Sequence, residues 1–173
     1  MSIHIIIDGY NLIRQSGFLS VFDRRDIQDG REALIDMLTA YKKIKGHQVT
    51  VVFDGADAPG FSQTRDLIKG IRVRFSRSGE SADDAIKKMA SKEREKALIV
   101  SSDLDVVDFA ALKGCATISS PMFEEKIAMA AYMDSKGIDQ EDQSGWIPST
   151  KKKGTSKRMS KKKRRSRVKI QKL

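Results

Sequence analysis

Three short and almost wholly apolar runs constrain the fold of this chain more than any other feature of its sequence. They cover residues 3–7, 49–53 and 97–100. Apolar runs of this length without alternation are typical of strands that helices cover on both faces of a parallel sheet. Amphipathic helical patterns separate the runs along the chain. The alternation of strands and helices predicts an α/β fold with a mainly parallel sheet of about five strands.

Two further strands and four helices complete the predicted core. Residues 71–75 alternate strictly between apolar and polar side chains, which indicates an edge strand with one face toward solvent or a ligand. Residues 115–118 form a short fifth candidate strand. Periodicity and capping signals predict helices over 27–44, 81–89, 104–113 and 120–136.

Acidic residues follow the predicted strands at the points where they end. In a parallel sheet these ends share one edge, so acids that are far apart in the sequence are expected to converge there. Carboxylates a few ångströms apart repel one another, and a bound cation normally offsets this repulsion. Oxygen ligands favour a hard ion, Mg²⁺ or Mn²⁺. The acids concerned are Asp8, Asp54, Asp83, Asp84, Asp103 and Asp105.

Each of these acids also fits a purely structural role. Asp83 and Asp84 follow Ser81, and Asp103 opens another predicted helix, as capping residues do. Asp54 precedes Gly55, which is typical of a turn. The coincidence of acids at four strand ends favours a shared site over four independent caps. Gly9, next to Asp8, is expected to keep the turn open so that a phosphate can approach the backbone.

Residue counts exclude several other kinds of chemistry. The chain has two histidines, His4 and His47, too few for imidazole acid–base pairs and poorly placed for a Ser-His-Asp triad. It has no Gly-rich phosphate loop, so no nucleotide cofactor is expected. Cys115 is the single cysteine, which excludes an intrachain disulfide and a cysteine metal cluster. Metal-assisted hydrolysis of a phosphodiester is the chemistry that remains.

The positive charge of the chain is concentrated at one end. The net charge is +10, and residues 151–173 hold 13 of the 33 lysines and arginines and none of the 23 acids. This composition predicts a folded domain over 1–138 and a disordered basic tail over 139–173. We expect the tail to bind RNA without sequence preference. Its RNA-binding candidates are Lys151, Lys152, Lys153, Lys161, Lys162, Lys163, Arg164 and Arg165.

Arginines on the alternating strand form a second RNA-binding candidate. Arg72 and Arg74 share one face of that strand, and Arg77 follows it. Arginine side chains suit phosphate groups, so this face is expected to hold the RNA backbone near the acids. The alternative is that these charges protect an edge strand from aggregation.

Neither a membrane span nor a secretory signal is evident in the sequence. No apolar run approaches the roughly 20 residues that cross a bilayer. Residues 1–4 do not begin a charged and then apolar secretory leader. We therefore expect a cytoplasmic protein.

Four stretches resemble the NYN domain, and most closely its YacP-like subfamily within the PIN-like nuclease superfamily. They read IIIDGYNLI, VVFDG, SADDAI and IVSSDLDV, and the likeness covers residues 3–136. The resemblance implies a PIN-like three-layer fold with strand order 3-2-1-4-5. It also implies a metal-dependent endoribonuclease that cleaves RNA, with messenger or ribosomal RNA and the ribosome as candidate partners. The alternative is a catalytically weak RNA-binding or ribosome-associated module with the same fold.

The resemblance also implies a set of site residues. By motif match, the catalytic residues are Asp8, Asn11, Asp83, Asp84 and Asp103, and the metal ligands are Asp8, Asp84 and Asp103. Two points stay open at this stage: which of Asp83 and Asp84 faces the site, and whether Asp54 and Asp105 bind the metal or are structural.

Overall fold

The computed structural model describes residues 2–55, 65–137 and 160–173. Its centre is a six-stranded sheet in the order β3-β4-β2-β1-β5-β6, in which every neighbouring pair is parallel except β3 with β4. The five predicted strands take the predicted order 3-2-1-4-5 within it. The strands are β1 (His4–Asp8), β2 (Gln48–Phe53), β3 (Arg65–Ile68), β4 (Ile71–Phe75), β5 (Ala97–Val100) and β6 (Ala116–Ile118).

The expectation that residues 71–75 form an edge strand is wrong, because β3 pairs along the outer side of β4. A two-residue turn joins these strands, and both turn residues have positive φ, 50° at Lys69 and 82° at Gly70. Turns with two positive φ values match the twist of an antiparallel hairpin. The alternation within β4 is real, since Ile71, Val73 and Phe75 are buried. The sequence of β3 has too little apolar alternation to predict a strand.

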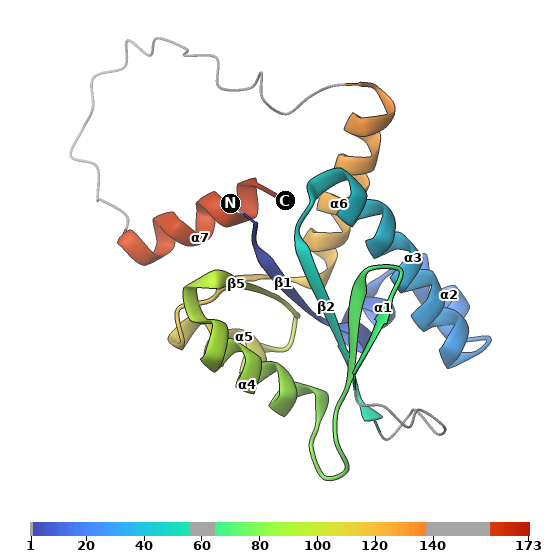
Figure 1. Ribbon diagram of the computed structural model, residues 1–173, viewed down its shortest axis with the longest axis horizontal. Helices are drawn as coiled ribbons and strands as arrows, with labels where there is room; N and C mark the ends of the chain where they lie inside the picture. Colours follow the sequence, from blue (N-terminus) through green and yellow to red (C-terminus); the bar gives the residue numbers. More distant parts are fainter. Residues whose placement is uncertain (1, 56–64, 138–159) are drawn as a thin grey trace.

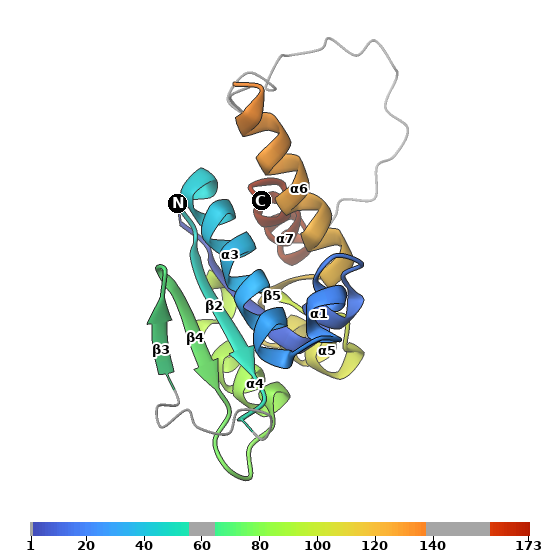
Figure 2. The ribbon, with the colours of Figure 1, turned by 90° about the vertical axis from the view of Figure 1, so that its right-hand side faces the viewer.

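Helices cover both faces of the sheet, as the apolar strands require (Figures 1 and 2). One face packs against α1 (Gly9–Gln15), α2 (Leu19–Asp23), α3 (Ile27–Lys45) and α6 (Ser120–Ser135). The other packs against α4 (Ala82–Glu93), which a 3-10 turn (Arg94–Lys96) follows, and α5 (Leu104–Leu112). Because successive strand residues point to opposite faces, Ile5 and Ile7 join the first core and Ile6 the second. The four predicted helices correspond to α3, α4, α5 and α6.

The expected disorder of residues 139–173 is wrong for their last part. Residues 160–173 contain a helix, α7 (Lys161–Gln171), and residues 138–159 lie outside the described residues. Leu173 is buried in the larger core, and the Tyr41 hydroxyl donates a hydrogen bond of 3.3 Å to its carbonyl oxygen. Two apolar residues near the end of the chain, Ile170 and Leu173, therefore pack this basic helix against the core. Among the described residues, no helix is long and apolar enough to cross a membrane.

Candidate active site at the carboxyl edge of the sheet

Asp8 is a buried carboxylate at the end of β1, with 7% of its surface exposed. Its Oδ1 accepts a hydrogen bond of 3.2 Å from the Asn11 backbone N–H and thereby caps helix α1. Its Oδ2 accepts a second bond, also 3.2 Å, from the Ser101 hydroxyl. Helix capping by Asp8 is compatible with a place in a functional site, because capping uses only one of its two carboxylate oxygens.

Ser101 links Asp8 to Asp103. The Ser101 hydroxyl lies at the end of β5, is fully buried, and accepts a bond of 3.1 Å from the Asp103 backbone N–H while it donates to Asp8. Asp103 in turn caps α5, with its Oδ1 accepting from the backbone N–H groups of Asp105 (2.8 Å) and Val106 (3.4 Å). One hydroxyl group therefore links the carboxylate at the end of β1 to the turn that follows β5.

The structure separates the roles of Asp83 and Asp84, which the sequence left open. Asp84 forms a reciprocal capping box with Ser81, with bonds of 3.1 and 3.3 Å, and these bonds lower the pKa of its carboxyl group. Asp83 instead interacts electrostatically with Asp8 and Asp103. Asp83, rather than Asp84, is thus the α4 acid whose charge acts on Asp8. We call Asp8, Asp83 and Asp103 the acid centre.

Burial and mutual repulsion raise the pKa values of Asp8 and Asp83. Burial is the main cause that raises the pKa of Asp8 to about 6, and the charges of Asp83 and Asp103 add to it. The hydrogen bonds from Asn11 and Ser101 oppose the rise. Partial burial and the charge of Asp103 likewise raise the pKa of Asp83. A cation at this place would relieve the repulsion.

Asn11 has a fixed side-chain orientation. Its Oδ1 accepts bonds from the Ser102 backbone N–H at 3.0 Å, the Ser120 hydroxyl at 2.7 Å and Gln15 Nε2 at 3.4 Å. A backbone N–H can only donate, so the Asn11 atom that faces Ser102 must be the oxygen. Asn11 therefore offers its amide N–H₂ group, rather than its oxygen, to a ligand. Sequence reasoning missed Ser101, Ser102 and Ser120, although the first two directly precede Asp103.

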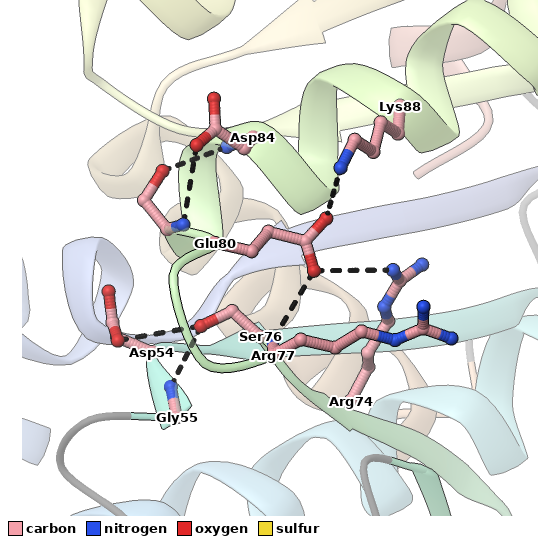
Figure 3. A network of polar contacts seen from close by, with 9 residues as sticks. Asp54, Gly55, Arg74, Ser76, Arg77, Glu80, Asp84 and Lys88 are labelled. Carbon is pink, nitrogen blue, oxygen red and sulfur yellow. Dashed lines mark hydrogen bonds and ion pairs between the residues drawn. The ribbon is translucent and has the colours of Figure 1, made fainter.

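Asp54 and Asp105 are placed at the margins of the acid centre. Asp54 Oδ1 accepts a bond of 3.4 Å from the hydroxyl of Ser76, which follows β4 (Figure 3). Asp105 is 77% exposed in its side chain and forms an ion pair with Lys87 of α4, although its charge still acts on Asp83. Lys87, which sequence reasoning also missed, is the cation beside these acids, and its own pKa is raised by Asp105.

Two of the arginines predicted to bind RNA, Arg72 and Arg74, have side-chain partners inside the protein. Arg74 Nη2 lies 4.0 Å from Glu80 Oε2, and Lys88 Nζ lies 2.9 Å from Glu80 Oε1 (Figure 3). The backbone N–H of Arg77 also donates to Glu80, at 3.3 Å. Arg72 Nη1 donates to Gln48, at the opposite end of the strands from the acids, at 3.3 Å. Arg74 therefore helps to hold the loop that leads into α4 and Asp83.

The basic residues of the described part of the tail do not lie beside the acid centre. Lys151, Lys152 and Lys153 lie outside the described residues. Lys161, Lys162, Lys163, Arg164 and Arg165 belong to α7, which crosses the amino ends of the strands, at the sheet edge opposite the acids (Figure 1). The fold thus places the acid centre at the carboxyl ends of the strands and the basic helix α7 at their amino ends.

Gly9 serves packing rather than the approach of a phosphate. It is buried, and a Cβ atom at this position would lie 2.3 Å from Phe53 Cε1 and 2.9 Å from Val51 Cγ1. The absence of a side chain therefore lets the first turn of α1 rest directly on β2. The expectation drawn from the sequence is wrong because Gly9 faces the core.

The donor set of the acid centre suits a hard cation that remains largely hydrated. Among the described residues, no three carboxylate, imidazole or thiolate groups are arranged to enclose a metal ion. Mg²⁺ commonly binds through one or two carboxylates and keeps several waters, so it does not require such a cage. The buried carboxylate of Asp8, with Asp83 and Asp103 near it, has the right chemistry for this mode of binding.

Comparison with known proteins extends the likeness over nearly the whole chain. A family model of the YacP-like NYN domain matches residues 5–172. The chain is 29% identical over 86 residues to YacP of Bacillus subtilis strain 168, and this match spans half the length of each protein.

Two crystal structures show the same fold. One is Rae1 (YacP) from Bacillus subtilis, with a TM-score of 0.65 and 23% identity over 80% of each chain. The other is a point mutant of the same protein, with a TM-score of 0.64 and 20% identity over 77% of this chain and 79% of that one. Since the family model covers residues 5–172 and the fold agrees, the chain belongs to the YacP-like NYN domain family, a group of PIN-like nuclease domains.

Proposed function

We propose that this protein is a divalent-metal-dependent endoribonuclease and that Asp8, Asp83 and Asp103 hold its metal ion. The observation that carries the proposal is the convergence of three acids from three separate elements at one edge of the sheet. Ligands of open α/β sheets bind at this edge. Membership of a family of nuclease domains supports a phosphodiester as the substrate, and the basic composition of the chain supports RNA as the polymer.

The residues around the acid centre have distinct tasks in this proposal. Mg²⁺ or Mn²⁺, held by the three carboxylates, would supply an activated water and stabilise the leaving oxygen. Ser101 orients the Asp8 carboxylate, and the Asn11 amide N–H₂ group donates a hydrogen bond to a phosphate oxygen. Ser102 and Ser120 hold Asn11 in the orientation that this donation requires. Because the hydrogen bonds of Ser101, Ser102 and Ser120 form before substrate binds, these side chains need little rearrangement during the reaction.

Two neighbouring acids provide the sharpest test. Asp83→Asn and Asp84→Asn remove the same charge from the same turn of α4, but only Asp83 belongs to the acid centre. We expect wild-type protein to cut a labelled single-stranded RNA internally in Mg²⁺ or Mn²⁺ and not in EDTA. Asp83→Asn should slow cleavage at least about a hundredfold, whereas Asp84→Asn should stay within about threefold of wild type.

Two results would contradict the proposal. Equal rates for Asp83→Asn and wild type would remove Asp83 from the catalytic set. RNA binding without cleavage by wild-type protein in either metal ion, with and without ribosomes, would favour a non-catalytic RNA-binding module. Circular dichroism and thermal unfolding of each variant provide the folding control.

A further inference from the structure

A groove lies between α7 and the amino ends of the strands. Its volume is about 830 Å³, and its walls come from the start of β1, the region between α4 and β5, and one side of α7. We call it the α7 groove. Its lining includes Ile3 and Gln48, at the amino ends of β1 and β2, so it lies at the opposite sheet edge from the acid centre and is a separate feature of the molecule. Pockets that hold small molecules and cofactors span roughly 300–1,000 Å³, so the groove has room for a ligand of nucleotide size.

Positive charge dominates the walls of the α7 groove. Two carboxylates, Glu93 and Glu95, face an excess of cations. Glu95 forms an ion pair with Arg165, and Glu93 Oε1 lies 3.8 Å from His4 Nδ1. The surplus positive charge predicts an anionic ligand. The cations of the lining are Lys96, Lys162, Arg164, Arg165, Lys169 and Lys172.

The α7 cations of the groove fall into two groups. Lys162 and Lys169 donate to the carbonyl oxygens of Ala111 and Ala97, and Arg165 pairs with Glu95, so these three attach α7 to the domain. Within the described part of the chain, no hydrogen bond or ion pair engages the side chains of Arg164 and Lys172. Arg164 of α7 and Lys172, which directly follows this helix, are therefore the cations of this segment that can bind a ligand without loss of structural contacts.

We propose that the α7 groove binds a phosphate-bearing nucleotide, either a free nucleotide or a unit of a single RNA strand. Arginine and lysine are the side chains that recognise phosphate. Ile3 and Val168 add apolar surface beside them, which suits the nucleoside part of the ligand. The size of the groove limits occupancy to one or two nucleotides. This site does not depend on the acid centre or on cleavage.

The test compares two pairs of substitutions within residues 160–173. Arg164→Gln with Lys172→Gln removes two charges from the groove. Lys163→Gln with Arg167→Gln removes two charges from exposed positions of α7 that do not line it. Binding of a fluorescein-labelled ten-nucleotide oligouridylate is measured by anisotropy in EDTA, with ADP as competitor. The groove pair should weaken binding at least about tenfold and the exposed pair less than about threefold.

Each outcome decides for or against the groove. Displacement of the oligonucleotide by ADP supports a site for free nucleotides, and binding of the oligonucleotide alone supports a site for an RNA strand. Equal losses of affinity in the groove and exposed double variants would overturn the proposal. So would the failure of wild-type protein to bind either the oligonucleotide or ADP. A charge-retaining pair, Arg164→Lys with Lys172→Arg, should bind like wild type and unfold at the same temperature. Because EDTA prevents metal-dependent cleavage, an inactive acid centre would leave all these results unchanged.

Discussion

At the scale of single residues, the acid centre depends on which atoms of each polar side chain are already engaged. Asp83 and Asp84 are neighbours of the same chemical type, yet Asp84 is engaged by Ser81 while Asp83 acts on Asp8 and Asp103. Asn11 presents its amide N–H₂ group because its oxygen is engaged by donors. The contacts of a residue, rather than its type, therefore determine its role at this edge.

Asp8 should make the protein less stable as the pH rises, in the absence of divalent metal. Its pKa is about 6 in the folded protein, against an ordinary value of 3.8. The folded state therefore holds a proton that the unfolded state has released between about pH 4 and pH 6, so stability from this group is present below that range and lost through it. Asp8→Asn keeps the shape without the charge. At pH 7.5 it should raise the free energy of unfolding by about 1–3 kcal/mol.

The measurement is urea unfolding of both proteins in EDTA from pH 4.5 to 7.5. The difference between them should shrink toward low pH, where Asp8 is protonated in the wild-type protein. A difference that does not change with pH would show that burial does not raise the pKa of Asp8. Titration with Mg²⁺ provides the control, since it should stabilise the wild-type protein more than Asp8→Asn.

At the scale of elements, the site depends on how closely α1 packs on β2. Helix α1 carries Asn11 and begins directly after Asp8, so any shift of its first turn moves both side chains. Gly9 permits this packing because Phe53 and Val51 occupy the space that a side chain would take. The ring of Tyr10, 5.1 Å from the ring of Phe53, continues the same contact.

Gly9→Ala should therefore destabilise the protein and displace α1. Alanine is ordinarily the better helix former, but overpacking at 2.3 Å from a buried ring costs about 1–3 kcal/mol or more. Gly17→Ala is the matched control, since nothing lies within 4 Å of a Cβ atom there. Thermal unfolding should separate the two variants, and an equal midpoint for Gly9→Ala and Gly17→Ala would contradict the packing role.

At the scale of the whole molecule, α7 returns the end of the described chain to the domain core. Leu173 is 2% exposed within the larger core cluster, where the Tyr41 hydroxyl bonds to its carbonyl oxygen. His47 Nε2 lies 3.2 Å from the Lys172 carbonyl oxygen and adds a second polar contact. The basic helix is thus part of the folded domain. It places positive charge at the amino ends of the strands, whereas the acids lie at their carboxyl ends.

Leu173→Ala should lower the stability of the domain, because it removes a buried side chain from the core. Loss of a buried leucine costs about 2–5 kcal/mol, and the lower part of this range is expected near a chain end. Gln171→Ala is the control, since Gln171 is exposed on the same helix. Urea unfolding would measure both variants. Identical stability for Leu173→Ala and wild type would mean that α7 does not dock through Leu173.

The sequence by itself determined the class of the fold and the edge of the sheet at which the acids meet. Unbroken apolar runs require helices on both faces, and acids placed after parallel strands must share one edge. Both conclusions depend on local patterns. The structure confirms the fold class through the predicted order of five strands, and it places Asp8 at the end of β1, where Ser101 donates a hydrogen bond to it.

Only the tertiary structure decided what depends on contacts between distant residues. Asp83 and Asp84 both fit the local pattern, and the neighbourhood of Asp103 separates them. Gly9 faces Phe53, which lies far along the sequence. Helix α7 is held by two apolar residues that reach the core and by polar contacts of Lys162, Arg165 and Lys169 with the domain. A pattern of residue types indicates local structural preference. The roles of Asp83, Gly9 and α7 depend instead on contacts between residues that are distant in the sequence.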